Sequence, residues 1–454
     1  VAPPHTQQLS VRPARERTHT FDRTAAVSVV LRAALEDPRV SRAEVVEQAD
    51  GSVIATVHAD RAPKAVDHTA LRTQLEALAE ADPHGQVHLE VQRARPTQEV
   101  LLRTAAVPGY GWRGLAPDDL GAHAVRVDGP GLTNGLVTVV ADQTDGTFTI
   151  DGVSGLGRIV DDGDAGDTYN WSPPVDAVEI DRPTHVDVAV TEAGPVRGRI
   201  EITRRYRWPT HVHHGERAGE ADVVVTTSLE LHAGDDAVRV TVRFDNPCRD
   251  HRVRIWFPLP EPADHSSAEC AFAVVDRGLL AEGGPNEAPL ATFPSRRFVA
   301  AGGLLVAHDG LCEYELVDLT GEGDDLRAGA LAVTLLRSVG VISQGPMPMR
   351  ALPAGPPTPT PDAQMIGPQV LRLALRLGPG VDASGGHELA DRAFTPLLTA
   401  HLPGGDGVGD PSASGQALHC SMPVSSLTRR PDGRTEIRVV AGPHGDTLSL
   451  GGRT

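Results

Sequence analysis

The chain has 454 residues, a formal net charge of −18 and a pI near 5.5. Its length predicts about two to four domains. The acidic balance argues against nucleic acid as a partner, because neutralising phosphates needs clustered Lys and Arg. No apolar run approaches the ~20 residues that span a bilayer, so we expect a soluble protein with no membrane partner. We also expect this acidic protein to tolerate homo-oligomerisation.

The four cysteines are far apart and never form a C-x-x-C pair. This spacing fits neither a zinc ribbon nor a dense disulfide framework, so it predicts reduced thiols and a cytoplasmic location. The chain begins at Val1 without a methionine, so a preceding targeting signal could have been lost.

The N-terminal part predicts two segments. Residues 1–20 are polar and arginine-rich and predict a loose lead-in, whereas residues 21–93 predict a small α+β unit or a diverged β segment. Within it, residues 27–35, 52–59 and 86–93 predict strands or short mixed elements.

One stretch of this unit predicts a helix. Asp67 can cap its start, and Leu71, Leu75 and Leu78 recur at helical spacing, which predicts a face in the core. The pair Asp82-Pro83 is expected to end the helix.

From residue 94 onward, short apolar runs alternate with Gly, Pro, Asp and Asn, and helix signals nearly vanish. The fold class is therefore mainly β, with antiparallel sheets stacked as sandwiches. We expect a large β-sandwich over 94–346, a Pro-rich linker over 347–364 that crosses a surface, and a truncated set of terminal strands over 365–454.

Residues 161–174, DDGDAGDTYNWSPP, combine four aspartates with Tyr169, Asn170 and Trp171. The glycines at 163 and 166 are expected to adopt positive φ, and the two prolines prevent a strand or helix from continuing. Carboxylates and rings together suit a polyhydroxylated ligand. Spacing alone favours the alternative, a solvated acidic turn that closes a hairpin.

Other catalytic signatures are absent: the chain has no G-x-S-x-G elbow, P-loop or H-E-x-x-H motif. The aspartate-rich loop also fails the EF-hand spacing, although calcium bound with another geometry stays open. His211, His213 and His214 offer a zinc alternative, against the simpler interpretation of exposed histidines at a hairpin tip.

Residues 245–258, DNPCRDHRVRIWFP, form a second dense polar stretch. The favoured interpretation is a charged hairpin in which Asp250 pairs with Arg252 or Arg254 and orders the turn.

Several stretches in the same order resemble the C-terminal β region of glycoside hydrolase family 38, the α-mannosidases. The loop 161–174 is similar to the family's G-D-x-G-D-x-Y-x-x-x-P, and 245–258 to its N-x-x-x-D-H-R-x-R-x-x-F. Residues 95–115, 131–150 and three later segments extend the resemblance over roughly 94–440, while the helix-containing segment departs from the family pattern.

The resemblance implies a galactose-mutarotase-like supersandwich and, for the intact enzyme, zinc-dependent retaining hydrolysis of terminal α-mannosides. It places both catalytic carboxylates and the zinc ligands in an N-terminal catalytic domain, which this sequence lacks. We therefore expect no catalytic residue and no bound metal here. The expected partners are mannose-containing oligosaccharides and the protein's own catalytic domain.

For individual residues, the resemblance makes Tyr169 a substrate contact, with Asp164, Asp167 and Asn170 supporting the loop. Asp250, His251 and Arg252 resemble structural residues of the charged hairpin rather than catalytic ones. A stand-alone carbohydrate-binding or scaffold protein without catalysis remains the alternative.

Overall fold

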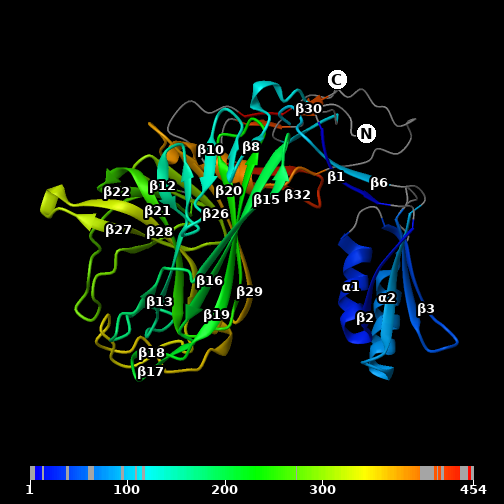
Figure 1. Ribbon diagram of the computed structural model, residues 1–454, viewed down its shortest axis with the longest axis horizontal. Coiled ribbons are helices and arrows are strands. Elements are labelled where there is room, and N and C mark those ends of the chain that lie inside the picture. Colours follow the sequence, from blue (N-terminus) through cyan, green and yellow to red (C-terminus); the bar gives the residue numbers. More distant parts are fainter. Residues whose placement is uncertain are drawn as a thin grey trace. The chain divides into compact units, whose positions relative to one another are not determined.

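The computed structural model describes residues 6–12, 15–36, 40–59, 66–93, 97–107, 110–114, 118–271, 273–398, 414–416, 418–420, 424–439 and 448–450. It divides into two compact units, Val1–Leu102 and Arg103–Thr454 (Figure 1). Among the described helices, none is long and apolar enough to cross a membrane.

The first unit is an α+β layer. Its elements are β1 (Thr6–Arg12), β2 (Arg15–Asp22), α1 (Arg23–Glu36), β3 (Val40–Glu47), β4 (Val53–Ala59), α2 (His68–Ala81), β5 (Gln86–Arg93) and β6 (Thr97–Leu102). A four-stranded sheet in the order β2-β5-β4-β3 packs against both helices, while β1 and β6 pair with each other. Among the described strand pairs of this unit, only β4 and β5 run parallel.

The predicted helix is confirmed as α2. The Asp67 carboxylate accepts from the N–H of Ala70 at 2.9 Å, Leu71 and Leu75 are buried, and the helix ends just before Asp82. The helix packs against the sheet through its leucine face, because this contact removes apolar surface from water.

Two other expectations for this unit differ from the structure. The N-terminal residues form β1 and β2 rather than a loose lead-in, because β6 and β5 supply their backbone hydrogen bonds. Residues 27–35 lie in α1, not in a strand. Ala26, Val30 and Ala34 are buried at four-residue spacing, and Asp22 accepts from the N–H of Ala25, so packing and capping outweigh the strand preference of valine.

The second unit contains most of the strands. The first of them are β7 (Gly111–Arg113), β8 (Arg126–Asp128), β9 (Gly131–Thr133), β10 (Thr138–Ala141), β11 (Phe148–Ile150), β12 (Val153–Leu156), β13 (Arg158–Gly163), β14 (Glu179–Ile180), β15 (His185–Ala193), β16 (Arg197–Trp208), β17 (His211–His213), β18 (Glu216–Ala218), β19 (Ala221–His232), β20 (Val238–Asn246) and β21 (His251–Ala263).

The remaining elements are β22 (His265–Cys270), β23 (Ala273–Gly278), β24 (Thr292–Pro294), β25 (Phe298–Ala301), β26 (Leu304–Asp309), β27 (Glu313–Thr320), β28 (Arg327–Ser338), β29 (Gly367–Leu377), α3 (Gly386–Phe394), β30 (Ser414–Gln416), β31 (Leu418–Cys420), β32 (Val424–Arg429), β33 (Thr435–Val439) and β34 (Leu448–Leu450). Short 3₁₀ turns occupy 121–123, 323–325, 361–364 and 383–385. The expected mainly β fold is confirmed.

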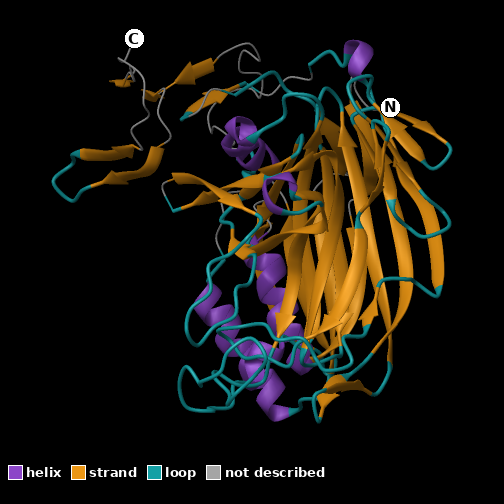
Figure 2. Ribbon diagram, turned by 90° about the vertical axis from the view of Figure 1, so that its left-hand side faces the viewer, coloured by secondary structure: helices purple, strands orange, loops and turns teal. Residues whose placement is uncertain are grey.

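Two large antiparallel sheets form the sandwich (Figures 1 and 2). One has six strands in the order β14-β13-β21-β28-β27-β24, and the other has nine in the order β15-β16-β19-β20-β29-β26-β25-β22-β23. The buried ring of Trp208, on β16, contacts that of His251, on β21, with ring centroids 5.8 Å apart. A smaller sheet has the order β12-β11-β10-β9-β8.

The Pro-rich segment 347–364 does more than cross a surface. It connects β28 of one large sheet to β29 of the other, and both Arg350 and Gln364 within it are buried. β29 then lies inside the nine-stranded sheet between β20 and β26 instead of among separate terminal strands. Further along the chain, β32 pairs with β33.

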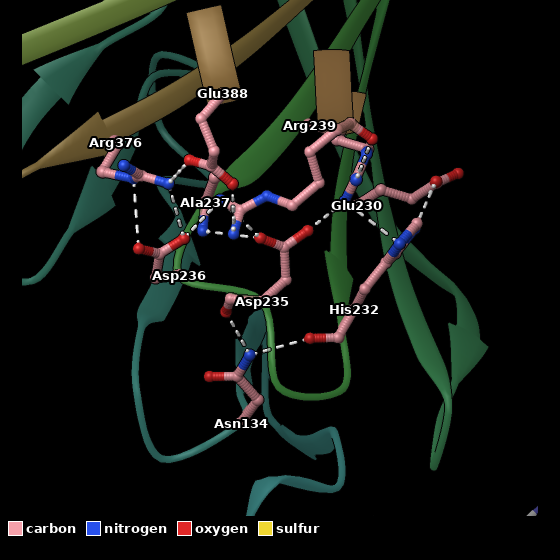
Figure 3. Close-up of polar contacts among 10 residues, drawn as sticks. Asn134, Glu230, His232, Asp235, Asp236, Ala237, Arg239, Arg376 and Glu388 are labelled. Carbon is pink, nitrogen blue, oxygen red and sulfur yellow. Dashed lines mark hydrogen bonds and ion pairs between the residues drawn. The ribbon is translucent and has the colours of Figure 1, made fainter. Parts of the chain in front are cut away.

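Helix α3 is fastened to the nine-stranded sheet by polar contacts (Figure 3). Arg376, on β29, bonds to Glu388 of α3 at 2.8 Å and to Asp236 of the β19–β20 turn at 3.1 Å. Buried Asn134 donates to the carbonyl oxygen of Asp235 in the same turn at 2.7 Å. These contacts fix the turn and the helix together.

The start of α3 also makes a close apolar contact. A Cβ at Gly386 would lie 2.4 Å from the ring of Phe298, which is fully buried. We therefore expect Gly386→Ala to lower the free energy of unfolding by about 1–3 kcal/mol through overpacking. Urea denaturation measures this, with Gly278→Ala as the control because its Cβ would meet nothing within 4 Å. Equal stability of the two variants would contradict the expected clash.

Candidate functional site

The loop 161–174 begins inside strand β13, which pairs with β21 so that residue 161 lies opposite 253 and residue 162 opposite 252. All four aspartates of the loop are buried, with at most 4% of any residue exposed. The interpretation as a solvated acidic turn is therefore wrong. The same burial shows that these carboxylates do not line an open surface.

Asp161 lies in a buried polar cluster. Its carboxylate bonds to Nδ1 of His251 at 2.6 Å and also pairs with Arg217. The other ring nitrogen of His251 lies 3.0 Å from Oδ1 of Asn246, so each nitrogen faces an oxygen. This arrangement fixes the imidazole ring, at the start of β21, between Asp161 of β13 and Asn246 at the end of β20.

Asp162 is the partner of Arg252 and Arg254 on β21. The expectation of a hairpin over 245–258 is wrong, because this stretch connects β20 of one large sheet to β21 of the other. The Asp162 carboxylate accepts from Arg252 at 2.8 Å and from Arg254 at 3.1 Å. The Arg252 guanidinium also lies over the ring of Trp171, 4.1 Å from its centroid. The loop and strand β21 are thus joined by ion pairs and by a cation–π contact.

Asp250 does not pair with either arginine, so that expectation is wrong. Asp250 has a φ of 52° and forms two hydrogen bonds with the Gln364 side chain, at 3.0 Å through its N–H and at 2.7 Å through its carboxylate. The left-handed backbone directs the carboxylate toward the Pro-rich segment, away from the arginines of β21.

Asp164 and Asp167 accept most of the loop's internal hydrogen bonds. Asp164 accepts from the backbone N–H of Gly166 at 2.9 Å and from Arg337 at 2.7 Å. Asp167 accepts from the N–H groups of Tyr169, at 2.9 Å, and Asn170, at 3.1 Å. Each carboxylate replaces the backbone partners that a regular strand would provide.

Arg350, like Arg337, is a residue of this site that the sequence pattern missed. Its buried guanidinium pairs with Asp167 and donates to Oδ1 of Asn170. The backbone N–H of Gln344 donates to the same Asp167 carboxylate at 2.9 Å. Burial acts to raise the pKa of Asp167, but the hydrogen bonds from Arg350 and Gln344 outweigh it, so the pKa lies below its ordinary value.

Tyr169 is the exposed aromatic residue of the loop, with 59% of its surface accessible. Its ring centroid lies 5.8 Å from the guanidinium carbon of Arg350, and the preceding Thr168 donates to the carbonyl of Ile342 at 2.7 Å. The structure therefore places the phenol ring in solvent above a fully braced loop. A rigid aromatic group of this kind can stack on a sugar and offer it a hydroxyl.

Neither loop glycine adopts the expected positive φ. Glycine is needed at both positions because other atoms of the loop lie very close to its Cα. A Cβ at Gly166 would lie 2.0 Å from the carbonyl oxygen of Asn170, and one at Gly163 would lie 2.3 Å from the ring of Pro174. Both positions require glycine because the loop folds back on itself.

The histidine-rich hairpin tip forms β17 and β18, with the rings of His213 and His214 4.1 Å apart. Across the parts of the chain that the structure describes, no group of three or more His, Cys, Asp or Glu side chains could hold a metal ion.

Asp164 gives the loop an unusual pH dependence. Burial raises its pKa from 3.8 to about 6, against the lowering effect of Arg337. The folded state therefore holds a proton that the unfolded state releases between these values, so this group's contribution to stability falls as the pH rises from about 4 to 6, by about 2–3 kcal/mol in all.

We expect Asp164→Asn, which carries no titrating group, to lack this trend. The difference in unfolding free energy between the variant and the native chain should shift in the variant's favour between pH 4 and pH 7. Urea denaturation at four pH values measures the drift. A constant difference, or a drift in the opposite direction, would contradict the raised pKa.

Comparisons with known proteins relate this fold to glycoside hydrolases. Over 208 residues, 41% of the chain, it is 27% identical to the "Putative mannosylglycerate hydrolase" of Halalkalibacterium halodurans, of which it covers 22%. An α-mannosidase structure from Enterococcus faecalis matches 78% of the chain with a TM-score of 0.56 and 18% identity. No family model matches.

A second solved structure, a glycosyl hydrolase family 38 protein from Enterococcus faecalis, matches 80% of the chain with a TM-score of 0.58 and 18% identity. The chain spans 40% and 44% of these two solved chains. Fold and comparisons together define a β-rich protein related to glycoside hydrolases. Within that class its resemblance is to family 38, the α-mannosidases, and this resemblance is confirmed.

Proposed function

We propose that this chain is the carbohydrate-binding β region of an α-mannoside hydrolase and that Tyr169 completes the sugar pocket of a catalytic domain. The observation that carries the proposal is the braced loop 161–174, which holds one aromatic side chain in solvent while its acidic groups are paired inside. The fold shared with α-mannosidase structures supports the same assignment.

The chemistry of the reaction belongs to other residues. A retaining glycosidase needs two carboxyl groups about 5 Å apart, one free to attack and one to exchange a proton. The four loop aspartates bond instead to arginine, histidine or backbone N–H groups. Among the described residues, no group of His, Cys, Asp or Glu side chains fits a zinc ion, and our proposal assigns the zinc ligands to the catalytic domain.

The test is hydrolysis of 4-nitrophenyl α-mannoside. We expect the protein that joins this chain to its catalytic domain to release 4-nitrophenol, and the 454-residue chain alone to release none. The 4-nitrophenyl β-mannoside is the control substrate. Chelator-sensitive release by the isolated chain would overturn the proposal, as would inactivity of the joined protein on every α-mannoside tried.

A second candidate is a carbohydrate-binding protein without catalysis. It is favoured by the loop 161–174, which exposes the ring of Tyr169 while its carboxylates are paired inside. The two candidates differ in one measurement: a binding protein would bind mannosides as this chain alone, and joining it to a catalytic domain would add no hydrolysis that depends on Tyr169.

A further inference from the structure

The tyrosine and tryptophan side chains fall into two groups. The chain has four of each, and most are buried or covered. Trp171 and Trp256 each carry an arginine guanidinium over the ring. The exposed ones are Tyr169 in the loop and a second pair elsewhere, Tyr110 at 46% and Trp112 at 55% exposed.

Trp112 lies in the short strand β7, opposite Gly415 of β30. A Cβ at Gly415 would lie 2.6 Å from Nε1 and 3.0 Å from Cε2 of the indole, so the ring packs directly on the backbone of the facing strand. A glycine–aromatic pair across two strands stabilises them, and that accounts for the packed side of the ring. This pairing does not explain why more than half of the Trp112 surface is exposed to solvent.

Tyr110 stands two residues before Trp112, in the turn that precedes β7, with a φ of 56°. Two residues of chain span at most about 7 Å, which matches the scale of one sugar ring. A flat indole with one packed and one open side, next to a phenol, combines an apolar surface with a hydroxyl group. The combination suits a pyranose ring, whose C–H groups and hydroxyls point in different directions.

This pair of aromatic residues is separate from the loop. The loop contacts the β17–β18 hairpin, where the N–H of Val175 donates to the carbonyl of Gly215 at 2.7 Å. Figure 1 places that hairpin and β30 at opposite ends of the second unit. One sugar ring therefore cannot contact both Tyr169 and Trp112.

We propose that Trp112, with Tyr110 beside it, is a second carbohydrate subsite that stacks a pyranose ring of a mannose-containing oligosaccharide. This inference rests on the proposed function for the class of ligand, and it adds a binding surface away from Tyr169. Such a surface would hold an oligosaccharide by a second sugar ring.

Binding of α-linked mannotriose to the 454-residue chain tests the subsite, measured by isothermal titration and by tryptophan emission. We expect saturable binding with a blue shift, about tenfold weaker in Trp112→Ala and intermediate in Trp112→Phe. Leu136→Ala, which alters another exposed apolar residue, should leave it unchanged. Thermal unfolding of each variant shows that the fold is retained.

The outcomes separate this inference from the proposed function. Loss of binding in Tyr169→Ala but not in Trp112→Ala, or no binding of mannotriose at all, overturns the subsite, even if the joined enzyme hydrolyses 4-nitrophenyl α-mannoside. Binding that depends on Trp112 in a protein that hydrolyses no α-mannoside supports the subsite and rejects the proposed enzyme.

Discussion

Replacing Asp167 with alanine is expected to lower the free energy of unfolding by about 3–5 kcal/mol, the range for breaking a buried ion pair from one side. The change leaves the Arg350 guanidinium buried, with 3% of its side chain accessible, without its carboxylate. It also removes the acceptor for the N–H groups of Tyr169, Asn170 and Gln344. Unpaired buried donors add their own cost.

Urea denaturation at pH 7 measures this loss. Asp222→Ala is the matched control, because Asp222 has 85% of its side chain accessible and pairs with exposed Arg207 at 3.6 Å, so we expect a change below about 0.5 kcal/mol. The double variant Asp167→Ala/Arg350→Met should recover part of the stability, since it removes the stranded charge. If Asp167→Ala costs no more than the control, the pair does not brace the loop.

The second large effect concerns catalysis by the protein that joins this chain to its catalytic domain. We expect Tyr169→Ala to reduce kcat/KM on α-mannosides on the order of 100-fold, as an aromatic contact at the centre of a binding site would. Tyr169→Phe should lose roughly 1–3 kcal/mol of transition-state stabilisation if the hydroxyl binds the sugar. The stability of both variants should stay near that of the native protein, because the ring is mostly in solvent.

Steady-state kinetics on 4-nitrophenyl α-mannoside and on an α-mannoside disaccharide measure these effects. Val175→Ala is the control, because Val175 follows the same loop and has 81% of its surface exposed. Unchanged kinetics in both tyrosine variants, at unchanged stability, would remove Tyr169 from the pocket.

The sandwich and one helix could be predicted because their signals are local. Antiparallel strands repeat over a few residues, and Asp67 with its leucine face defines α2 within one short stretch. Helix α1 could not be predicted in the same way. Its valines favour strands in isolation, and only the packing of Val30 and Ala34 against the sheet decides for the helix.

The candidate site shows a similar division. The density of charge and aromatics in 161–174 singled out this loop as the candidate site, but the direction of its carboxylates depends on partners far along the chain. Arg252 is 90 residues from Asp162, Arg337 is 173 residues from Asp164, and Arg350 is 183 residues from Asp167. No local pattern records such pairings. Tyr169 remains a prediction for substrate contact.

The pairing of β1 with β6 has a consequence for how the first unit can be altered. Arg12 lies opposite Thr97, so the chain enters and leaves this unit through neighbouring strands. The 84 residues between them can therefore be cut out and replaced by a two-residue hairpin turn without separating the strands on either side. We therefore expect that residues 13–96 can be deleted or exchanged for another segment while β1 and β6 keep their register.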